Sequence, residues 1–289
     1  MSIPVIDLSP SSTEFEIPVK TGKEQEKIFC RRWGDPEAEI VTVLCHGLGA
    51  HSGWFEPLAS RLSARKHRVY SCDLSGFGHG DRRRFDSYKQ WQDDLIALIN
   101  HAREENPGKP IILAGNSMGA LVALSSVERL EKPPSAMLLM SPGFEGFSGT
   151  FTLPYKLKAI FTALIAPAKI IALPYSVDDI TVNEKIREQV NADKLGKFAI
   201  PAGLGLELLK LTKEAVRKSK SMPCPVYLAT AGQERIVDNR FNDSFFERLD
   251  CPAKERVHFD DCRHDLVFED SVDSLAEGFS AWFQTLDSA

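Results

Sequence analysis

The pentapeptide Gly-Asn-Ser-Met-Gly at residues 115–119 limits the fold of this chain more than any other stretch. Residues 109–114 before it form a short apolar stretch of β type, and residues 120–124 after it favour a helix. Between a strand and a helix, a Gly-x-Ser-x-Gly sequence forms a sharp turn that needs glycine at its outer positions and exposes the serine hydroxyl. The helix that follows aims unpaired N–H groups and the positive end of its dipole at that hydroxyl. The sequence therefore predicts that Ser117 is a nucleophile; a glycine-rich loop without this function is the alternative.

Strand and helix patterns alternate along the rest of the chain. Continuous apolar runs, typical of strands that are buried on both faces, occupy residues 40–45, 68–73, 109–114, 136–142 and 225–231, with a shorter run at 255–259. Helical spacing of apolar residues follows at 54–62, 91–99 and 272–286. Two segments near the start, 14–19 and 26–33, are expected to form antiparallel edge strands. This order predicts an α/β fold with a mostly parallel sheet and helices on both faces.

One interval, residues 146–220, loses the strand signals and becomes helical. We expect it to be a helical cap inserted at the carboxyl edge of the sheet, so that residues 1–145 and 221–289 form the core. The cap side chains expected to contact substrate are Leu157, Phe161, Leu164 and Ile165.

The last predicted cap helix separates basic from apolar side chains. Its basic side carries Lys210, Lys213, Arg217 and Lys220, and its opposite side carries Leu208, Leu211 and Ala215. This pattern fits either a helix lying on a membrane surface or a solvated face opposite a packed one.

Composition excludes several classes of protein. The net charge of −5 gives no reason to expect a nucleic acid partner, and no run of about 18 apolar residues predicts a membrane-spanning helix. Residues 1–7 lack the basic start and apolar core of a signal peptide. The six cysteines show no CxxC spacing, so we interpret them as reduced thiols of a cytoplasmic protein, with a Cys251–Cys262 disulfide as an unsupported alternative. Because the seven histidines lack ligand spacing, neither a metal nor a cofactor is expected.

A serine nucleophile needs a base, and in this type of fold the order along the chain is serine, acid, histidine. His264 fits the base, because it lies in a polar loop between the last short strand and the closing helix. The acid should follow the strand that ends at residue 231. Glu234 is favoured for its position near the strand end, and Asp238 is the rival or a supporting second carboxylate.

The oxyanion of the reaction needs two N–H donors. One is expected from Met118, directly after the nucleophile, and the other from Leu48 in the glycine-containing loop that follows the strand at 40–45. His46 is expected to brace that loop by hydrogen bonds rather than to act as a base.

Four stretches, at residues 46–49, 73–78, 115–119 and 232–237, make the chain resemble the α/β-hydrolase family, and within it the monoacylglycerol lipase and lysophospholipase branch. The resemblance implies an α/β-hydrolase fold, a catalytic serine at Ser117 and a catalytic histidine at His264. It also implies that the cap forms an apolar tunnel for one acyl chain. The acid of the family is usually Asp and falls on Glu234, so the chain departs from the pattern by one methylene.

Together these features predict a serine hydrolase that cleaves carboxylic esters of a lipid-like substrate through an acyl-enzyme, as a monoacylglycerol lipase or lysophospholipase does. The aliphatic cap indicates a fatty acyl chain, and it could also touch a membrane from the cytoplasmic side. One alternative is a small-ester or thioester hydrolase with the same triad. Another is a ligand-binding receptor of the same fold that lacks turnover.

Overall fold

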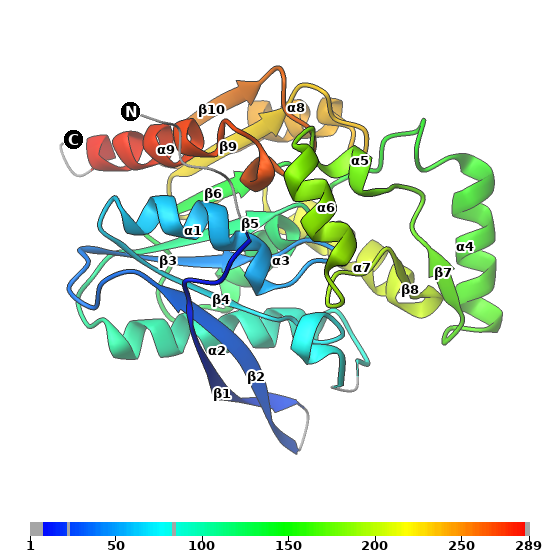
Figure 1. The fold of residues 1–289 in the computed structure, drawn as a ribbon, viewed down its shortest axis with the longest axis horizontal. Helices are drawn as coiled ribbons and strands as arrows, with labels where there is room; N and C mark the ends of the chain where they lie inside the picture. Colours follow the sequence, from blue (N-terminus) through cyan, green and yellow to red (C-terminus); the bar gives the residue numbers. More distant parts are fainter. Residues whose placement is uncertain (1–7, 22–23, 83–84, 287–289) are drawn as a thin grey trace.

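The computed structural model describes residues 8–21, 24–82 and 85–286, so residues 1–7, on which the signal-peptide prediction rests, lie outside it. The described residues form an eight-stranded sheet in the order β1-β2-β4-β3-β5-β6-β9-β10 (Figure 1). The parallel part consists of β4 (His67–Cys72), β3 (Ile40–Cys45), β5 (Ile111–Asn116), β6 (Ala136–Met140), β9 (Val226–Ala231) and β10 (Lys254–Phe259). At the other edge, β2 (Glu24–Trp33) is antiparallel to both β4 and β1 (Thr13–Thr21). The predicted mostly parallel sheet and its antiparallel edge are confirmed.

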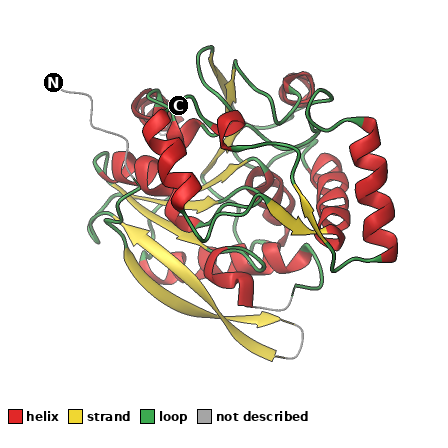
Figure 2. Ribbon diagram, turned by 45° about the vertical axis from the view of Figure 1, so that its right-hand side comes forward, coloured by secondary structure: helices red, strands yellow, loops and turns green. Residues whose placement is uncertain are grey.

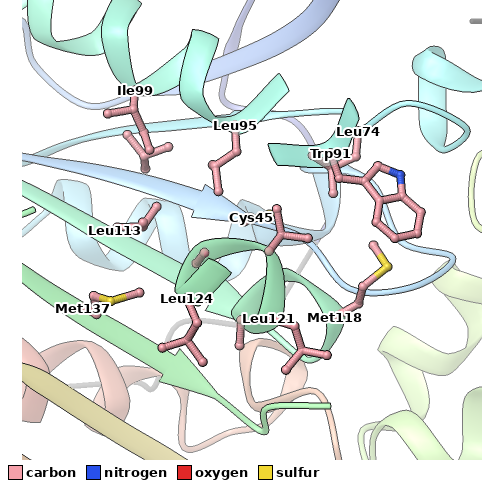
Figure 3. Packing of buried hydrophobic residues seen from close by; sticks show 14 of the residues in the cluster. Cys45, Leu74, Trp91, Leu95, Ile99, Leu113, Met118, Leu121, Leu124 and Met137 are labelled. Carbon is pink, nitrogen blue, oxygen red and sulfur yellow. The ribbon is translucent and has the colours of Figure 1, made fainter. Parts of the chain in front are cut away.

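Helices cover both faces of this sheet (Figures 1 and 2). One face packs against α2 (Lys89–Glu105), α3 (Met118–Ser126) and α8 (Asn239–Arg248), and the other against α1 (Glu56–Ser63) and α9 (Val272–Leu286). Alternate residues of a central strand therefore enter different cores: Leu113 of β5 belongs to the α2–α3 side, shown in Figure 3, and Ala114 to the α1–α9 side. Burial on both faces explains why these strands read as unbroken apolar runs.

The interval predicted to form a cap contains four helices and a small ribbon. The helices are α4 (Leu153–Ile165), α5 (Val177–Ile180), α6 (Glu184–Ala192) and α7 (Ala202–Lys218). The two antiparallel strands of the ribbon, β7 (Ile170–Ala172) and β8 (Ala199–Pro201), were not predicted, because three residues are too few to show a period. Figure 1 shows α4, β7 and β8 beyond the tips of the parallel strands. The division into core and cap at residues 146 and 220 stays a prediction.

The last cap helix, α7, packs on α3 and α4. Its residues Leu211 and Ala215 are fully buried in the core, whereas Lys210, Lys213 and Arg217 are exposed. Lys220 is also exposed but lies beyond the end of the helix. The two sides of α7 therefore differ as the sequence pattern indicated.

Short 3₁₀ helices complete the described chain. They are η1 (Ser52–Phe55), η2 (Gly78–Arg82), η3 (Val127–Arg129) and η4 (Leu266–Phe268). None of the described helices is both long and apolar enough to cross a bilayer.

Candidate active site

Ser117 lies on a sharp turn between β5 and α3. Its backbone has a φ of +54°, in a region that residues with a side chain rarely occupy. A Cβ atom at Gly115 would lie 2.5 Å from the carbonyl oxygen of Gly119, and one at Gly119 would lie 2.0 Å from that of Cys45. Both glycines are therefore required by contacts between backbone segments, as the sequence predicted.

Backbone hydrogen bonds hold this turn in place. The Ser117 N–H donates to the carbonyl oxygen of Met140 at 2.9 Å, and the Gly143 N–H donates to the carbonyl oxygen of Ser117 at 3.2 Å. The strand end of β6 thus fixes the strained turn from the side, while α3 begins directly after Ser117 and directs its first N–H groups there.

His264 and Glu234 meet beside this turn, although they are 30 residues apart in the sequence. The Nδ1 atom of His264 lies 2.8 Å from Oε2 of Glu234, and the side chains are only 5% and 3% exposed. The other carboxylate oxygen, Oε1, accepts the backbone N–H groups of Ile236 at 2.8 Å and Val237 at 3.2 Å. The loop after β9 therefore fixes the Glu234 carboxylate, which in turn orients the imidazole ring.

Asp238, the rival acid, has a different role in the structure. It is the N-cap residue of α8, where its Oδ1 accepts the N–H of Arg240 at 3.1 Å. Its carboxylate also pairs with the Arg240 guanidinium, which holds the pKa of Asp238 below its usual range. The contact with His264 is thus made by Glu234, and Asp238 stabilises the start of a helix.

The electrostatic surroundings of His264 favour its protonated form. Burial by itself lowers the pKa of this histidine, but the Glu234 carboxylate, with a smaller contribution from Asp265, outweighs burial and raises it. An imidazole in this setting accepts a proton readily at Nε2 while Nδ1 stays bound to the acid.

The loop after β3 approaches Ser117 from the opposite side. A Cβ atom at Gly47 would lie 3.3 Å from Cβ of Ser117, so this glycine permits the close approach. Within the loop, Nδ1 of His46 lies 2.8 Å from the Gly47 carbonyl oxygen, and Nε2 of His46 accepts the Leu74 N–H at 3.0 Å. Burial lowers the pKa of His46 to about 4, so the ring is neutral and serves as a brace.

A cavity of about 470 Å³ opens at Ser117 and extends under the cap. The expected oxyanion residues Leu48 and Met118 both line it next to Ser117. Its wall is largely apolar and includes Phe144, Phe151, Ala159, Ile160, Ala163, Ile171, Leu173, Ile200, Leu206, Leu208, Leu209, Ile236 and Val237. The volume is typical of a pocket for a small organic molecule.

The structure does not bring the four predicted cap residues into this cavity. Leu157, Phe161, Leu164 and Ile165 point outward from α4 and are 59%, 62%, 70% and 67% exposed. Instead, the wall takes Tyr155, Ala159, Ile160 and Ala163 from a neighbouring face of the same helix. The prediction of which face of α4 contacts the cavity was wrong. Apolar residues occur all around this helix, so the helical period of the sequence cannot show which of them face inward.

A second, smaller cavity of about 20 Å³ lies at the same serine. It is lined by Ser117 and His264 together, which places the expected nucleophile and base at one site. Two further polar residues of its wall, Asn116 and Asp265, were not singled out from the sequence. Asn116 precedes Ser117 and Asp265 follows His264 in the sequence, and this adjacency was the one feature of the sequence that could have pointed to them.

Among the residues that the structure describes, no group of three or more His, Cys, Asp and Glu side chains is arranged to hold an ion. All six cysteines are free, and the Cys262 thiol lies 2.9 Å from the hydroxyl of Ser271.

The sequence of this chain is similar to those of known hydrolases. Residues 36–271 match the sequence model of a protein family, Hydrolase_4, described as serine aminopeptidase, S33. The human monoglyceride lipase is 25% identical over 242 residues, covering 80% of this chain and 78% of the lipase. A phospholipase of Bacillus subtilis is 25% identical over 240 residues, covering 82% of this chain and 92% of the phospholipase.

A similar fold is found among solved structures. A soluble variant of the monoglyceride lipase from Saccharomyces cerevisiae, in complex with a substrate analog, superimposes with a TM-score of 0.82 at 16% identity. The match covers 98% of this chain and 97% of the yeast chain. The predicted α/β-hydrolase fold is thereby confirmed.

Proposed function

Since this chain belongs to the Hydrolase_4 family, serine aminopeptidase S33, we propose that it cleaves esters of long acyl chains, as in monoacylglycerols or lysophospholipids, with Ser117, His264 and Glu234 as its triad. The resemblance seen in the sequence is confirmed, and the chain is a carboxylic ester hydrolase.

The observation that carries the proposal is the apolar cavity of about 470 Å³ that ends at Ser117. A wall of aliphatic and aromatic side chains can bind an alkyl chain by burying its surface, at about 0.8 kcal/mol for each methylene. A short acyl group would leave most of this cavity unused. The volume and the lining therefore support an acyl chain of many carbons.

The proposed reaction uses contacts that surround Ser117. His264 takes the hydroxyl proton at Nε2 while Glu234 holds Nδ1, and the Ser117 oxygen attacks the acyl carbonyl carbon. The N–H groups of Leu48 and Met118 stabilise the oxyanion. His264 then gives its proton to the leaving alcohol, which departs and leaves an acyl-enzyme that water hydrolyses.

Labelling and kinetics test the proposal. A fluorophosphonate probe should label the folded protein, and Ser117→Ala should abolish both labelling and ester turnover while the melting temperature stays near that of the wild type. On p-nitrophenyl esters, kcat/KM should rise up to about fourfold for each added methylene until the cavity is filled. An unlabelled Ser117 would favour a ligand-binding receptor, and a preference for acetate over decanoate would favour a small-ester or thioester hydrolase.

We also propose that the cap touches a lipid surface and that the protein works in the cytoplasm, peripheral to the membrane. The outward face of α4 exposes Leu157, Phe161, Leu164 and Ile165, and α7 beside it exposes basic residues. Apolar side chains with cations nearby are the features that bind an interfacial helix to anionic lipids. The free cysteines support a reducing compartment.

Vesicle flotation tests this contact. The wild type should bind vesicles with anionic lipid more tightly at low than at high salt, because part of the attraction is electrostatic. Leu164→Glu should weaken the binding and leave turnover of a dissolved short ester unchanged. Equal binding of the variant and the wild type would refute the contact through α4.

A further inference from the structure

The smaller cavity at Ser117 contains an unusual pair of polar side chains. The Asn116 side chain donates a hydrogen bond from Nδ2 to Oδ1 of Asp265, and both residues are nearly inaccessible to solvent. The pair links the residue before Ser117 to the residue after His264. Since a carboxylate can only accept, this bond fixes the orientation of the amide and leaves Oδ1 of Asn116 on the other side.

The Oδ1 atom of Asn116 has no hydrogen-bond partner among the residues that the structure describes. A buried amide oxygen without a partner carries a free-energy cost of about 1–3 kcal/mol, which a bound water would remove. The cavity that Asn116 lines has a volume of about 20 Å³, enough for one water molecule and too small for an alcohol of several carbons. The other residues of the wall with polar side chains are Ser117, His264, Asp265, Lys197, Tyr175 and Trp54.

We propose that this cavity binds the water that hydrolyses the acyl-enzyme and that Asn116 is a positioning residue for it. The inference rests on the proposed function, because it assumes an acyl group on Ser117. Nδ1 of His264 is bound to Glu234, so Nε2 is the nitrogen left to face the cavity. A water there can donate one hydrogen bond to Oδ1 of Asn116 and the other to Nε2 of His264, which leaves a lone pair for the acyl carbon.

The step balances with water as the second reactant. The water oxygen bonds to the acyl carbon, its proton moves to Nε2 of His264, and the carbonyl π electrons become the oxyanion. When the tetrahedral intermediate collapses, the bond between that carbon and the Ser117 oxygen breaks. The Ser117 oxygen then takes the proton from His264, and the carboxylic acid is released.

The Asp265 carboxylate holds the amide of Asn116 in this orientation. Burial raises the pKa of Asp265 to about 6, and its hydrogen bond from Asn116 and the nearby His264 oppose that rise. Above this pH the group is an acceptor, as the proposed arrangement requires. The backbone N–H of Asp265 also donates to the carbonyl oxygen of Ile180 at 2.9 Å, which anchors the loop against α5.

Pre-steady-state kinetics with p-nitrophenyl decanoate separates acylation from deacylation. Asn116→Leu keeps the size of the side chain and removes the amide. The rate of the p-nitrophenol burst, which reports acylation, should therefore stay unchanged, while the rate of the slow phase, which reports deacylation, should fall by about tenfold or more. Asn242→Leu is the matched control. Asn242 is equally buried in α8, has no partner for its amide among the described residues, and lines neither cavity.

A second variant at the same position tests the proposal if Asn116→Leu folds poorly. Asn116→Ala enlarges the cavity, so with methanol present the fraction of decanoyl groups transferred to methanol rather than water should exceed the wild-type fraction at least about twofold. If the role of Asn116 were purely structural, transfer of the decanoyl group to water and to methanol would slow equally, and the fraction transferred to methanol would not change.

The possible failures are distinguishable. If the wild type shows neither fluorophosphonate labelling nor an acyl-enzyme, the proposed function fails and this inference with it. If the wild type shows a normal burst but the deacylation rate and the methanol fraction are the same in the Asn116 variants, the water site is refuted and the proposed function stands.

Discussion

Replacing Glu234 by glutamine should disable the enzyme through the tautomer of His264. In the structure, Oε1 of Glu234 accepts two backbone N–H groups and Oε2 faces Nδ1 of His264. A glutamine must place its carbonyl oxygen where Oε1 was, because an NH₂ group there would oppose the two N–H donors. Its NH₂ group then points at Nδ1 of His264 and donates to it.

The magnitude follows from this exchange of donor and acceptor. When Nδ1 accepts, the imidazole proton moves to Nε2, which can no longer remove the proton of Ser117. The corresponding change in a serine protease triad lowers kcat by about 10⁴-fold, or about 5.5 kcal/mol, and we expect a loss of that size. Glu234→Asp should retain more activity, because a shorter carboxylate still accepts from Nδ1 when it reaches the ring.

Steady-state hydrolysis of a p-nitrophenyl ester measures this loss, and Asp238→Asn is the matched control. Asparagine caps a helix as well as aspartate does, and the lost ion pair involves the exposed Arg240, so kcat should stay within about threefold of the wild type. If Asp238→Asn cost more activity than Glu234→Gln, the assignment of Glu234 as the acid would be refuted.

Three further changes have directions that the structure sets. Gly205→Leu places a side chain in part of the larger cavity, since nothing lies within 4 Å of a Cβ atom at Gly205. It should shorten the preferred acyl chain by about four carbons, the number that the leucine side chain adds, and raise the melting temperature because leucine favours a helix more than glycine does; ester profiling and calorimetry measure the two effects. The pKa of His264 is raised, so the acidic limb of a plot of kcat/KM against pH should have its midpoint above about 6.5, the ordinary pKa of histidine. A lower midpoint would contradict the assignment of His264 as the base. Burial raises the pKa of Glu269 to about 7, so its carboxylate lowers stability as pH rises from about 4.5 to 7. The free energy of unfolding of Glu269→Gln, measured with denaturant, should therefore exceed that of the wild type by up to about 3 kcal/mol at pH 8 and equal it at pH 4. An equal difference at both pH values would refute this explanation.

The sequence predicted the sheet well because its strands carry a strong signal. A strand such as β5 is covered by helices on both faces, so nearly every residue must be apolar, and such runs are easily recognised. The turn at Ser117 was predictable for a steric reason, since backbone contacts at Gly115 and Gly119 exclude any side chain. These features depend on local geometry, which a sequence records directly.

The cap was predicted less well because its local signals are ambiguous. Helix α4 has apolar residues on its outer face, where Leu164 is 70% exposed, as well as on the face toward the cavity, where Ala163 is buried. A period of 3.6 residues shows which residues share a face but not which face meets the core. The sequence also could not decide between Glu234 and Asp238 as the acid. That choice depends on which carboxylate the loop after β9 directs at His264, and only the folded structure shows this contact.

The two cavities at Ser117 differ in a way that suits the two halves of the proposed reaction. In the proposed reaction, the larger, apolar cavity binds the acyl chain after the alcohol has left, so the acyl carbon, which is bonded to the Ser117 oxygen, keeps one orientation through deacylation. The smaller one is lined by His264, Asn116 and Asp265 and admits little more than water, so it favours hydrolysis over transfer of the acyl group to another alcohol. Such an arrangement makes the volume beside Asn116, rather than the acyl cavity, the determinant of which nucleophile completes the reaction.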